Sequence, residues 1–450
     1  MDYQSPKFQQ SIELIHEQNY SAACVLLEEV LTETPSLEAA YILSTTLFLA
    51  RDFIKAIDTL NALIEYDADN PKYYKTKFYY FYDLHQMEAL KEDDFQKFSN
   101  FFLLEIYEKI IQPESNSEFK FLLSQIYRKM NNIPRMLDSL RQALVTDQVS
   151  RERIYSLDEE SLKYFMNFES LRRSPAFDYP NHIAFETFAK CNAKCTFCVY
   201  PDMARQGTMM SMDLIHKIIS DLQEIPRHHP FQLSPFAVNE PFLDKRFFNI
   251  LDLIADKLPH AKITLTSNAS PINESNLRQL SKYQIDYLWL SVIDHRRDIY
   301  EDKMKLNYDR LIERLDLMHQ AKSDGWFDKR IVLSRLKDNS EHDEAYINFF
   351  NDRYPLFETC LWPYANWIGR TTNAITSEIK PIPCSHWFEI RIDANGIVQH
   401  CCMDGHSEYP WGDVNKNSIL EIYNQESYRN LRRGGKTRLD VEPCNRCNLT

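Results

Sequence analysis

Glycine is scarce in this chain, with 8 residues among 450. Loops that wrap phosphate groups need several glycines close together, so a glycine-rich phosphate site is nearly excluded. Long apolar runs are also missing, and the first ten residues (MDYQSPKFQQ) lack the basic and apolar segments of a signal peptide. We therefore expect a cytoplasmic protein with no membrane partner.

Basic residues are fewer than acidic ones, with 52 Lys and Arg against 65 Asp and Glu, so the net charge is -13. Binding along a nucleic acid needs clustered basic side chains that neutralise phosphates, so we expect no nucleic-acid partner. Apolar residues make up 44% of the chain, enough to bury a sizeable core, and the length suits two or three domains.

Cysteine is uncommon too, with 10 residues, but most of them are clustered. Cys24 and Cys360 stand alone, and we interpret them as core residues. The other eight form two groups: Cys191, Cys195 and Cys198, then Cys384, Cys401, Cys402, Cys444 and Cys447. In a reducing compartment such clusters favour metal binding over disulfides, so the sequence predicts metal centres.

Residues 5–150 have the periodicity of amphipathic helices, with a repeat of roughly 34 residues. Segments 19–35, 52–68 and 132–148 align, and a longer unit rich in Tyr and Phe spans 71–116. The aligned apolar positions are Ala23, Leu27, Val30, Ala56, Leu60, Leu63, Met136, Leu140 and Ala143. The pattern resembles tetratricopeptide repeats, whose concave groove holds a peptide or protein. A plain helical cap without a groove is the alternative.

We expect this helical repeat domain to cover 1–155, followed by a connector helix and linker over 156–180. From 181 onward strands and helices alternate. The expected strands are 182–188, 231–238, 262–267, 286–293, 330–336 and 356–362, and the expected helices are 211–225 (with Ser211 as N-cap), 244–258, 273–283 and 308–322. This pattern predicts parallel strands flanked by helices, in an α/β partial (β/α)6 barrel of the TIM type over 181–380. Chemistry in such folds lies at the carboxyl ends of the strands.

The first cysteine group follows the first strand directly. Three thiolates can hold a four-iron cluster and leave one iron without a protein ligand, whereas a structural zinc site would need a fourth ligand. The spacing Cys-x3-Cys-x2-Cys, with Phe197 before the last cysteine, resembles the radical S-adenosylmethionine (SAM) superfamily.

The resemblance implies further cofactor-binding residues, in order along the chain. Asn239, Glu240 and Pro241 stand where the family has Gly-Glu-Pro, which cradles the amino group of SAM, so the first glycine is replaced here. Asn268, Ser291 and Arg335 match later positions, Arg335 as a candidate for the SAM carboxylate.

The resemblance also implies the reaction. A [4Fe–4S] cluster on Cys191, Cys195 and Cys198 binds SAM at its open iron and cleaves it reductively. The resulting 5′-deoxyadenosyl radical takes a hydrogen atom from the substrate, while the protein positions the cofactors and excludes water. A flavodoxin- or ferredoxin-type protein is the expected electron donor.

The second cysteine group surrounds a hairpin signal, EIRIDANGIVQHC, in which Gly396 can take a positive φ. Together with the closing Pro-Cys-x2-Cys, residues 381–450 resemble the C-terminal SPASM module in its short form, called twitch. This implies one auxiliary [4Fe–4S] cluster with no vacant iron, and two clusters in all. A four-thiolate zinc module fits the same spacing. The implied ligands are Cys384, Cys401, Cys444 and Cys447, although Cys402 can exchange roles with Cys401. Residues 430–440 are expected to form a flexible turn.

Three hypotheses for the function follow. In the first, the enzyme oxidatively modifies a ribosomally made precursor peptide, for example by a crosslink, and holds a peptide or protein on its N-terminal helices. In the second, it is a dehydrogenase of a sugar or cyclitol in natural-product biosynthesis. In the third, it is a repeat scaffold with an inactive barrel, since Asn239 departs from the family pattern. No general base can be assigned.

Overall fold

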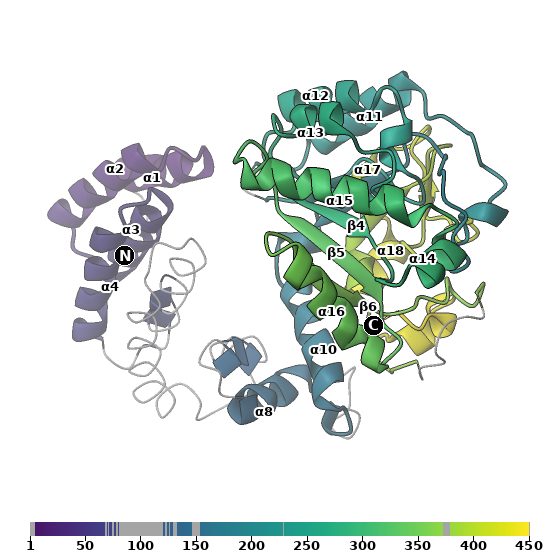
Figure 1. The fold of residues 1–450 in the computed structure, drawn as a ribbon. Coiled ribbons are helices and arrows are strands. Elements are labelled where there is room, and N and C mark those ends of the chain that lie inside the picture. Colours follow the sequence, from purple (N-terminus) through teal and green to yellow (C-terminus); the bar gives the residue numbers. More distant parts are fainter. Residues whose placement is uncertain are drawn as a thin grey trace. The chain divides into compact units, whose positions relative to one another are not determined.

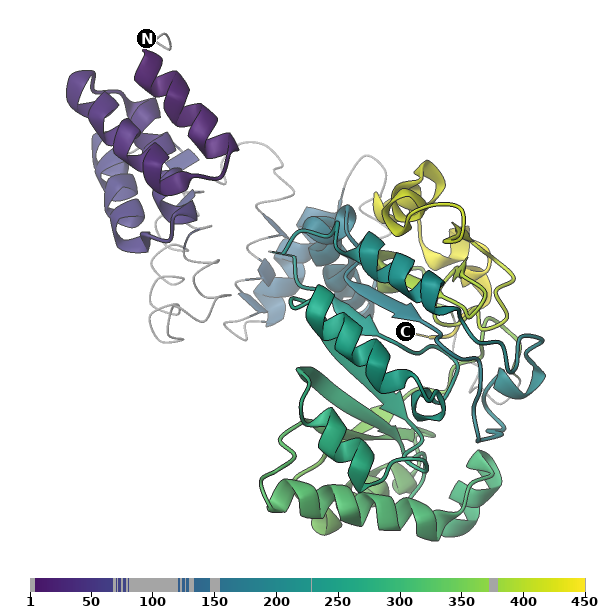
Figure 2. The same ribbon diagram turned by 90° about the horizontal axis from the view of Figure 1, so that it is seen from above.

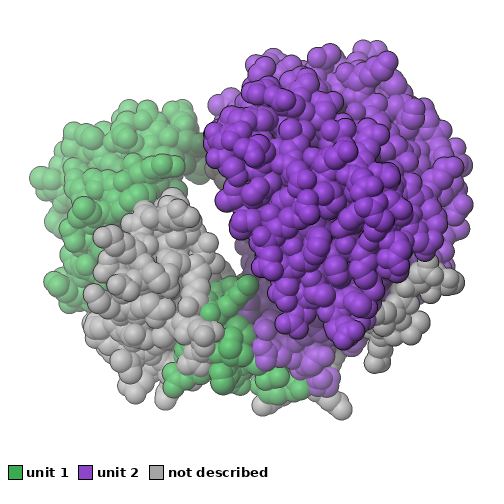
Figure 3. Space-filling model, in the orientation of Figure 1, with its two compact units in different colours: residues 1–155 green, residues 156–450 purple. Residues whose placement is uncertain are grey.

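The computed structural model divides the chain into two compact units, residues 1–155 and 156–450 (Figure 3). It describes residues 5–67, 154–227, 229–371 and 379–449, together with separate positions between 70 and 145 that include 133–145. Most of the expected helical unit over 71–116 lies outside the described residues.

The first unit is helical, as predicted. Its described helices are α1 (Pro6–His16), α2 (Tyr20–Glu33), α3 (Leu37–Leu49), α4 (Phe53–Tyr66) and α8 (Ile133–Leu144). All nine aligned positions of the expected repeat are buried, with Ala23, Leu27, Ala56 and Leu60 at 0% exposure. The small and apolar positions thus face the core, while the assignment to tetratricopeptide repeats stays a prediction.

The second unit contains a sheet that begins with six parallel strands, as predicted. Figure 1 shows part of this sheet with the helices around it. They are β1 (His182–Phe185), β2 (Gln232–Ser234), β3 (Lys262–Ser267), β4 (Ile285–Ser291), β5 (Ile331–Leu336) and β6 (Glu358–Trp362). The helices along this sheet are α11 (Met212–Leu222), α12 (Phe247–Lys257), α13 (Glu274–Leu280), α14 (Arg297–Met304), α15 (Tyr308–Ser323) and α16 (Glu341–Arg353). Ser211 is confirmed as the N-cap of α11, because its hydroxyl accepts a hydrogen bond from Leu214 N at 3.1 Å.

The C-terminal segment continues the same sheet. The predicted hairpin is confirmed as β7 (Glu389–Ile392) and β8 (Ile397–Gln399), followed by the short strand β9 (Gly412–Asp413). Gly396 turns the hairpin with φ +88°, and a Cβ there would lie 2.5 Å from the Asn415 side chain. Strand β7 pairs in parallel with β1, so the sheet has nine strands in the order β6-β5-β4-β3-β2-β1-β7-β8-β9. Figure 2 shows the yellow C-terminal segment beside this sheet.

The expected connector contributes to the core of the second unit. Helix α10 (Glu159–Arg172) is capped by Asp158, whose carboxylate accepts from Ser161 N at 2.7 Å. Its fully buried Phe168 meets Trp387 edge-on, with ring centroids 5.9 Å apart. The helix is therefore part of the domain that carries the cysteines.

The prediction of a flexible turn at 430–440 is wrong. Helix α18 spans Glu426–Arg432, and Arg432 and Arg438 are 0% and 2% exposed. The Arg432 guanidinium lies 3.6 Å from the centre of the Tyr423 ring, and Arg438 donates to the carbonyl oxygens of Cys447 and Leu449. These buried contacts hold the last residues against the domain.

Arg335 on β5 belongs to a buried ionic network. Its guanidinium donates to Asp343 at 2.7 Å, to Asp294 at 2.6 Å and to Asp338 at 3.0 Å, and the side chain is 1% exposed. Burial alone would raise the pKa of Asp294, but hydrogen bonds from Arg296 and Arg335 hold it well below its usual range. Arg335 thus fastens the end of β5 to the segment after β4, which argues against its expected role at the SAM carboxylate.

We predict that Arg335→Met lowers the free energy of unfolding of the second unit by about 3–5 kcal/mol, because it leaves buried carboxylates unpaired. All six tryptophans lie between residues 289 and 411, so their fluorescence in urea follows this unit alone. Arg330→Met is the matched control, since the Arg330–Glu358 pair is about half exposed on both sides and should contribute less than about 1 kcal/mol. Equal losses in the two variants would contradict the structural role of Arg335.

Candidate active site

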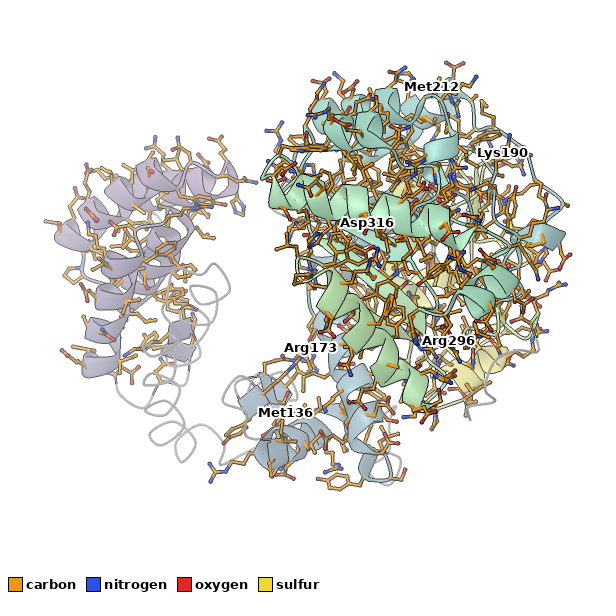
Figure 4. All side chains as sticks on the ribbon, viewed as in Figure 1. Met136, Arg173, Lys190, Met212, Arg296 and Asp316 are labelled. Atoms are coloured by element: carbon orange, nitrogen blue, oxygen red, sulfur yellow. The ribbon has the colours of Figure 1, made fainter. Side chains whose placement is uncertain are left out.

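The first cysteine loop starts at the carboxyl end of β1 and is closed by backbone hydrogen bonds. Ala189 and Gly207 bracket it: Gly207 N donates to Ala189 O at 2.7 Å, and Ala189 N donates to Thr208 O at 2.8 Å. Thr196 N donates to Lys303 O at the end of α14, at 2.9 Å. Figure 4 labels Lys190, which opens the loop, and Arg296, which follows β4. The loop is therefore held at both ends and at its tip.

The three thiols of this loop lie in a half-buried, sulfur-rich environment. Cys191 is approached by the Asn268 amide at 3.9 Å, Cys195 contacts the Met304 sulfur at 3.5 Å, and Cys198 accepts from Tyr200 N at 3.4 Å. Burial raises the pKa of Cys191 to about 12 and that of Cys198 to about 11. Such thiols lose their protons only when a cation is bound, which is how metal ligation proceeds.

Glu240 lies beside this loop and is 2% exposed. Its carboxylate accepts from Ser267 Oγ at 2.9 Å, from Asn268 N at 2.8 Å and from Phe242 N at 3.3 Å. A carboxylate has about four acceptor sites, so roughly one remains for a further donor. Burial raises the pKa of Glu240 to about 7. An ammonium group placed here would favour the ionised form.

Asn239 carries a buried amide nitrogen with no hydrogen-bond partner among the described residues. Its carbonyl oxygen, in contrast, accepts from Ala237 N at 2.9 Å. A buried unsatisfied donor costs free energy, so Nδ2 is poised for an acceptor that the protein itself does not supply. The residue that replaces the family glycine thus offers a donor beside Glu240.

The remaining expected residues are placed as follows. Asn268 follows β3 and bridges to the cysteine loop through Asn192 Oδ1 at 2.9 Å. Ser291 ends β4 and is half-buried. Phe197 is half-buried within the loop, and its carbonyl accepts from the Trp367 indole at 2.8 Å. Pro241 begins a short 3-10 helix and is buried.

The second cysteine group lies around the hairpin. Cys384 precedes β7, Cys401 and Cys402 follow β8, and Cys444 and Cys447 bound the last 3-10 helix. Burial raises the pKa of Cys444 to about 12 and that of Cys447 to about 11.

Cys401 and Cys402 are adjacent in the chain, and each affects the ionisation of the other. The Cys401 thiol donates a hydrogen bond to Cys402 and, together with His386 and Arg391, holds the pKa of Cys402 well below its usual range. Which of Cys401 and Cys402 is the ligand stays a prediction.

Two residues that the sequence did not single out join the two cysteine groups. Glu186, fully buried after β1, forms an ion pair with Arg205 at 2.6 Å, and Arg205 also donates to Gly405 O. Glu186 further accepts from Ala394 N at 3.4 Å, in the turn of the hairpin. The only feature of the sequence that could have pointed to Glu186 is that it is a charged residue directly after a buried strand.

The chemistry of both groups fits iron–sulfur clusters. In the part of the chain that the structure describes, no three His, Cys, Asp or Glu side chains converge closely enough to ligate a single metal ion. A four-iron cluster takes one cysteine per iron, so its cysteines need not meet at one point. Cys191, Cys195 and Cys198 would hold the first cluster, and Glu240 and Asn239 offer an acceptor and a donor for SAM.

A cavity of about 640 Å³ lies between β6 and the start of the second cysteine group. Trp362, Tyr364, Cys384 and His386 are among its lining residues. Tyr364 also meets Phe197 of the first loop edge-on, with ring centroids 6.3 Å apart. The cavity is therefore lined by Cys384 of the second group, and Tyr364 links it to the first loop.

Comparisons with known proteins agree with this arrangement. Residues 185–341 match the radical SAM superfamily, and residues 384–448 match the SPASM iron-sulfur cluster-binding domain. Comparison with curated proteins gives no match.

Solved structures to which this chain is similar include BtrN in complex with AdoMet and 2-DOIA (15% identity, 60% of this chain and 92% of that chain covered, TM-score 0.42). Streptococcus suis SuiB bound to precursor peptide SuiA is similar as well (14% identity, 74% of this chain and 87% of that chain covered, TM-score 0.45). A third is anSMEcpe with bound AdoMet and Cp18Cys peptide (14% identity, 59% of this chain and 86% of that chain covered, TM-score 0.43). Together, the cysteine loops and the two matched regions show that the chain belongs to the radical SAM superfamily and carries a C-terminal SPASM domain.

Proposed function

We propose that this radical SAM enzyme oxidises a ribosomally made precursor peptide, with a crosslink or a related bond as the product, and passes one electron to an auxiliary [4Fe–4S] cluster. The observation that carries the proposal is the pairing of β1 with β7. It brings the loop that would hold the SAM cluster and the hairpin that would hold the auxiliary cluster onto neighbouring strands of one sheet.

The chain's own residues would hold and orient the cofactors. Bound SAM and its cluster supply a 5′-deoxyadenosyl radical, which removes a hydrogen atom from the substrate. Glu240 would accept from the SAM ammonium through its remaining acceptor site. Phe197 would cover the cluster between Cys195 and Cys198. Ser291, at the end of β4, stays a candidate SAM contact.

The second cysteine group supplies a full ligand set. Cys384, Cys401 or Cys402, Cys444 and Cys447 provide four thiolates, so each iron of a four-iron cluster would have a protein ligand. A cluster with no open iron is suited to accept or relay an electron rather than bind substrate. An external flavodoxin- or ferredoxin-type donor would reduce the SAM cluster.

A peptide substrate is supported by the edge of the sheet. Strand β6 pairs with β5 on one side and has no other strand partner among the described residues. A free edge can take up an extended peptide by strand addition. The adjoining cavity would receive one side chain of that peptide, and the N-terminal helices would hold another part of it.

The cavity also favours a second candidate, the dehydrogenase of a sugar or cyclitol. A volume of about 640 Å³ is in the ordinary range for a small-molecule site. In that case the electron left after hydrogen abstraction would pass to the auxiliary cluster as an alcohol becomes a ketone. The retained Glu240 contacts weigh against the third hypothesis, an inactive scaffold.

We predict about eight irons per chain after anaerobic reconstitution, from two four-iron clusters. Replacing Cys191, Cys195 and Cys198 together by Ala should leave about four irons and abolish the formation of 5′-deoxyadenosine. Iron analysis and chromatography measure the two outcomes. The matched control is Cys24→Ala in the first unit, which should change neither. Full SAM cleavage by the triple variant would contradict the assignment of the first cluster.

We predict that SAM binds more tightly as the pH rises from about 6 to 8. Burial raises the pKa of Glu240 to about 7, and only the ionised carboxylate attracts the SAM ammonium. Glu240→Gln should weaken SAM binding roughly 10- to 100-fold and remove this pH dependence. Equilibrium dialysis of the reconstituted enzyme measures both effects, with Glu358→Gln as control. An unchanged pH profile in Glu240→Gln would exclude the ammonium contact.

The substrate class can be tested with the reconstituted full chain, SAM and a chemical reductant. We predict that a short peptide encoded beside the gene loses two hydrogens, detected by mass spectrometry. Cys191→Ala is the inactive control. Oxidation of a sugar or cyclitol from a test panel, with the peptide unchanged, would select the dehydrogenase instead.

A further inference from the structure

The sulfur of Cys444 receives two side-chain contacts in the interior of the protein. The Trp387 indole nitrogen donates to it at 3.5 Å, and His400 Nε2 lies 3.2 Å from it. Trp387, His400 and Cys444 are 1%, 3% and 5% exposed, so water hardly competes for these contacts.

Both nitrogens act as donors once Cys444 is a thiolate. An indole nitrogen can only donate, and a thiolate has only lone pairs to offer. A favourable contact between His400 Nε2 and the thiolate therefore requires that Nε2 carry the hydrogen. Hydrogen bonds to an ionised acceptor are stronger than neutral ones, and more so in a buried site.

Packing fixes the positions of both rings. The His400 ring stacks on Trp411 with centroids 5.1 Å apart, and Trp411 stacks on Tyr428 at 4.3 Å. On the other side, Phe168 holds Trp387 edge-on. Packing therefore holds both nitrogens toward the sulfur.

We propose that Trp387 and His400 raise the reduction potential of the auxiliary cluster through these two hydrogen bonds to Cys444. The inference rests on the proposed auxiliary [4Fe–4S] cluster. One electron enters the cluster, no bond to the protein forms or breaks, and no proton is taken up. The added negative charge is shared by the ligand sulfurs, so N–H donors stabilise the reduced state more than the oxidised state.

These donors would favour electron transfer from the substrate to the auxiliary cluster. Within the proposed reaction, the electron left on the substrate after hydrogen abstraction passes to the auxiliary cluster. Donors on Cys444 make that step more favourable. The first cysteine loop has a different environment, because the carboxylate of Glu240 lies near Cys191 and disfavours added negative charge.

The test uses the full chain with Cys191, Cys195 and Cys198 replaced by Ala, so that only the auxiliary cluster titrates. Its potential is measured by electron paramagnetic resonance during a reductive titration. Trp387→Phe and His400→Phe each remove one donor and keep an aromatic ring. Each should lower the reduced-to-oxidised ratio at a fixed potential by up to roughly tenfold, which corresponds to about 59 mV for one electron. The double variant should show a larger shift.

One further variant separates tuning from packing. His400→Gln keeps a side-chain N–H and should retain most of the parent potential, whereas a purely structural role would make it resemble His400→Phe. The controls are Trp326→Phe and His319→Phe, which are matched substitutions in the same unit away from the cysteines.

Three results would overturn the inference. An unchanged potential in the double variant with full iron content would show that the two contacts do not tune the cluster. The same shift in His400→Gln and His400→Phe would assign the effect to packing. Absence of any four-iron signal in the parent background would remove the proposed auxiliary cluster itself, a failure that iron analysis distinguishes from the other two. If the His400→Phe variant takes up no iron, the potential measured for Trp387→Phe tests the inference alone.

Discussion

The parallel pairing of β1 with β7 is the contact on which the arrangement of this protein depends. Four residue pairs, from His182–Glu389 to Phe185–Ile392, join segments about 200 positions apart. Without this contact, the first cysteine loop and the hairpin of the second group would belong to separate structures. The strand pairing also allows one buried ion pair, Glu186–Arg205, to contact both cysteine regions. Glu186 follows β1, and Arg205 donates to the backbone carbonyl of Gly405.

The two cysteine groups differ in a way that matches the roles proposed for them. The first offers three thiols, with carboxylates nearby and with donor and acceptor sites left open on Asn239 and Glu240. The second offers five thiols near Arg391 and Arg438, with the ring nitrogens of Trp387 and His400 directed at one sulfur. An open iron needs space for a ligand, whereas an electron acceptor needs surroundings that stabilise added negative charge.

Much of the parallel sheet with its helices could be predicted from the sequence, because its elements depend on local patterns. Residues 262–267 were expected as a strand and form β3 with the same bounds, and the hairpin around Gly396 follows from its turn residue. The cysteine loops could be found from spacing alone. Arg335 and Arg438 could not be placed in this way, because the charges and carbonyl groups that bury them come from other segments. His400 carried no local signal either, since its stacking partner and its sulfur lie 11 and 44 residues further along the chain.

The order of the strands also constrains when the protein can mature. Strand β1 lies between β2, which follows it closely, and β7, which is synthesised some 200 residues later. During translation the first sulfur loop emerges early, but the backbone carbonyl at Gly405 that anchors its Arg205 does not yet exist. Contacts of such long sequence separation form late in folding. The first loop therefore reaches its final shape only after residue 405 has left the ribosome, so iron would be loaded into a folded domain and not onto a growing one.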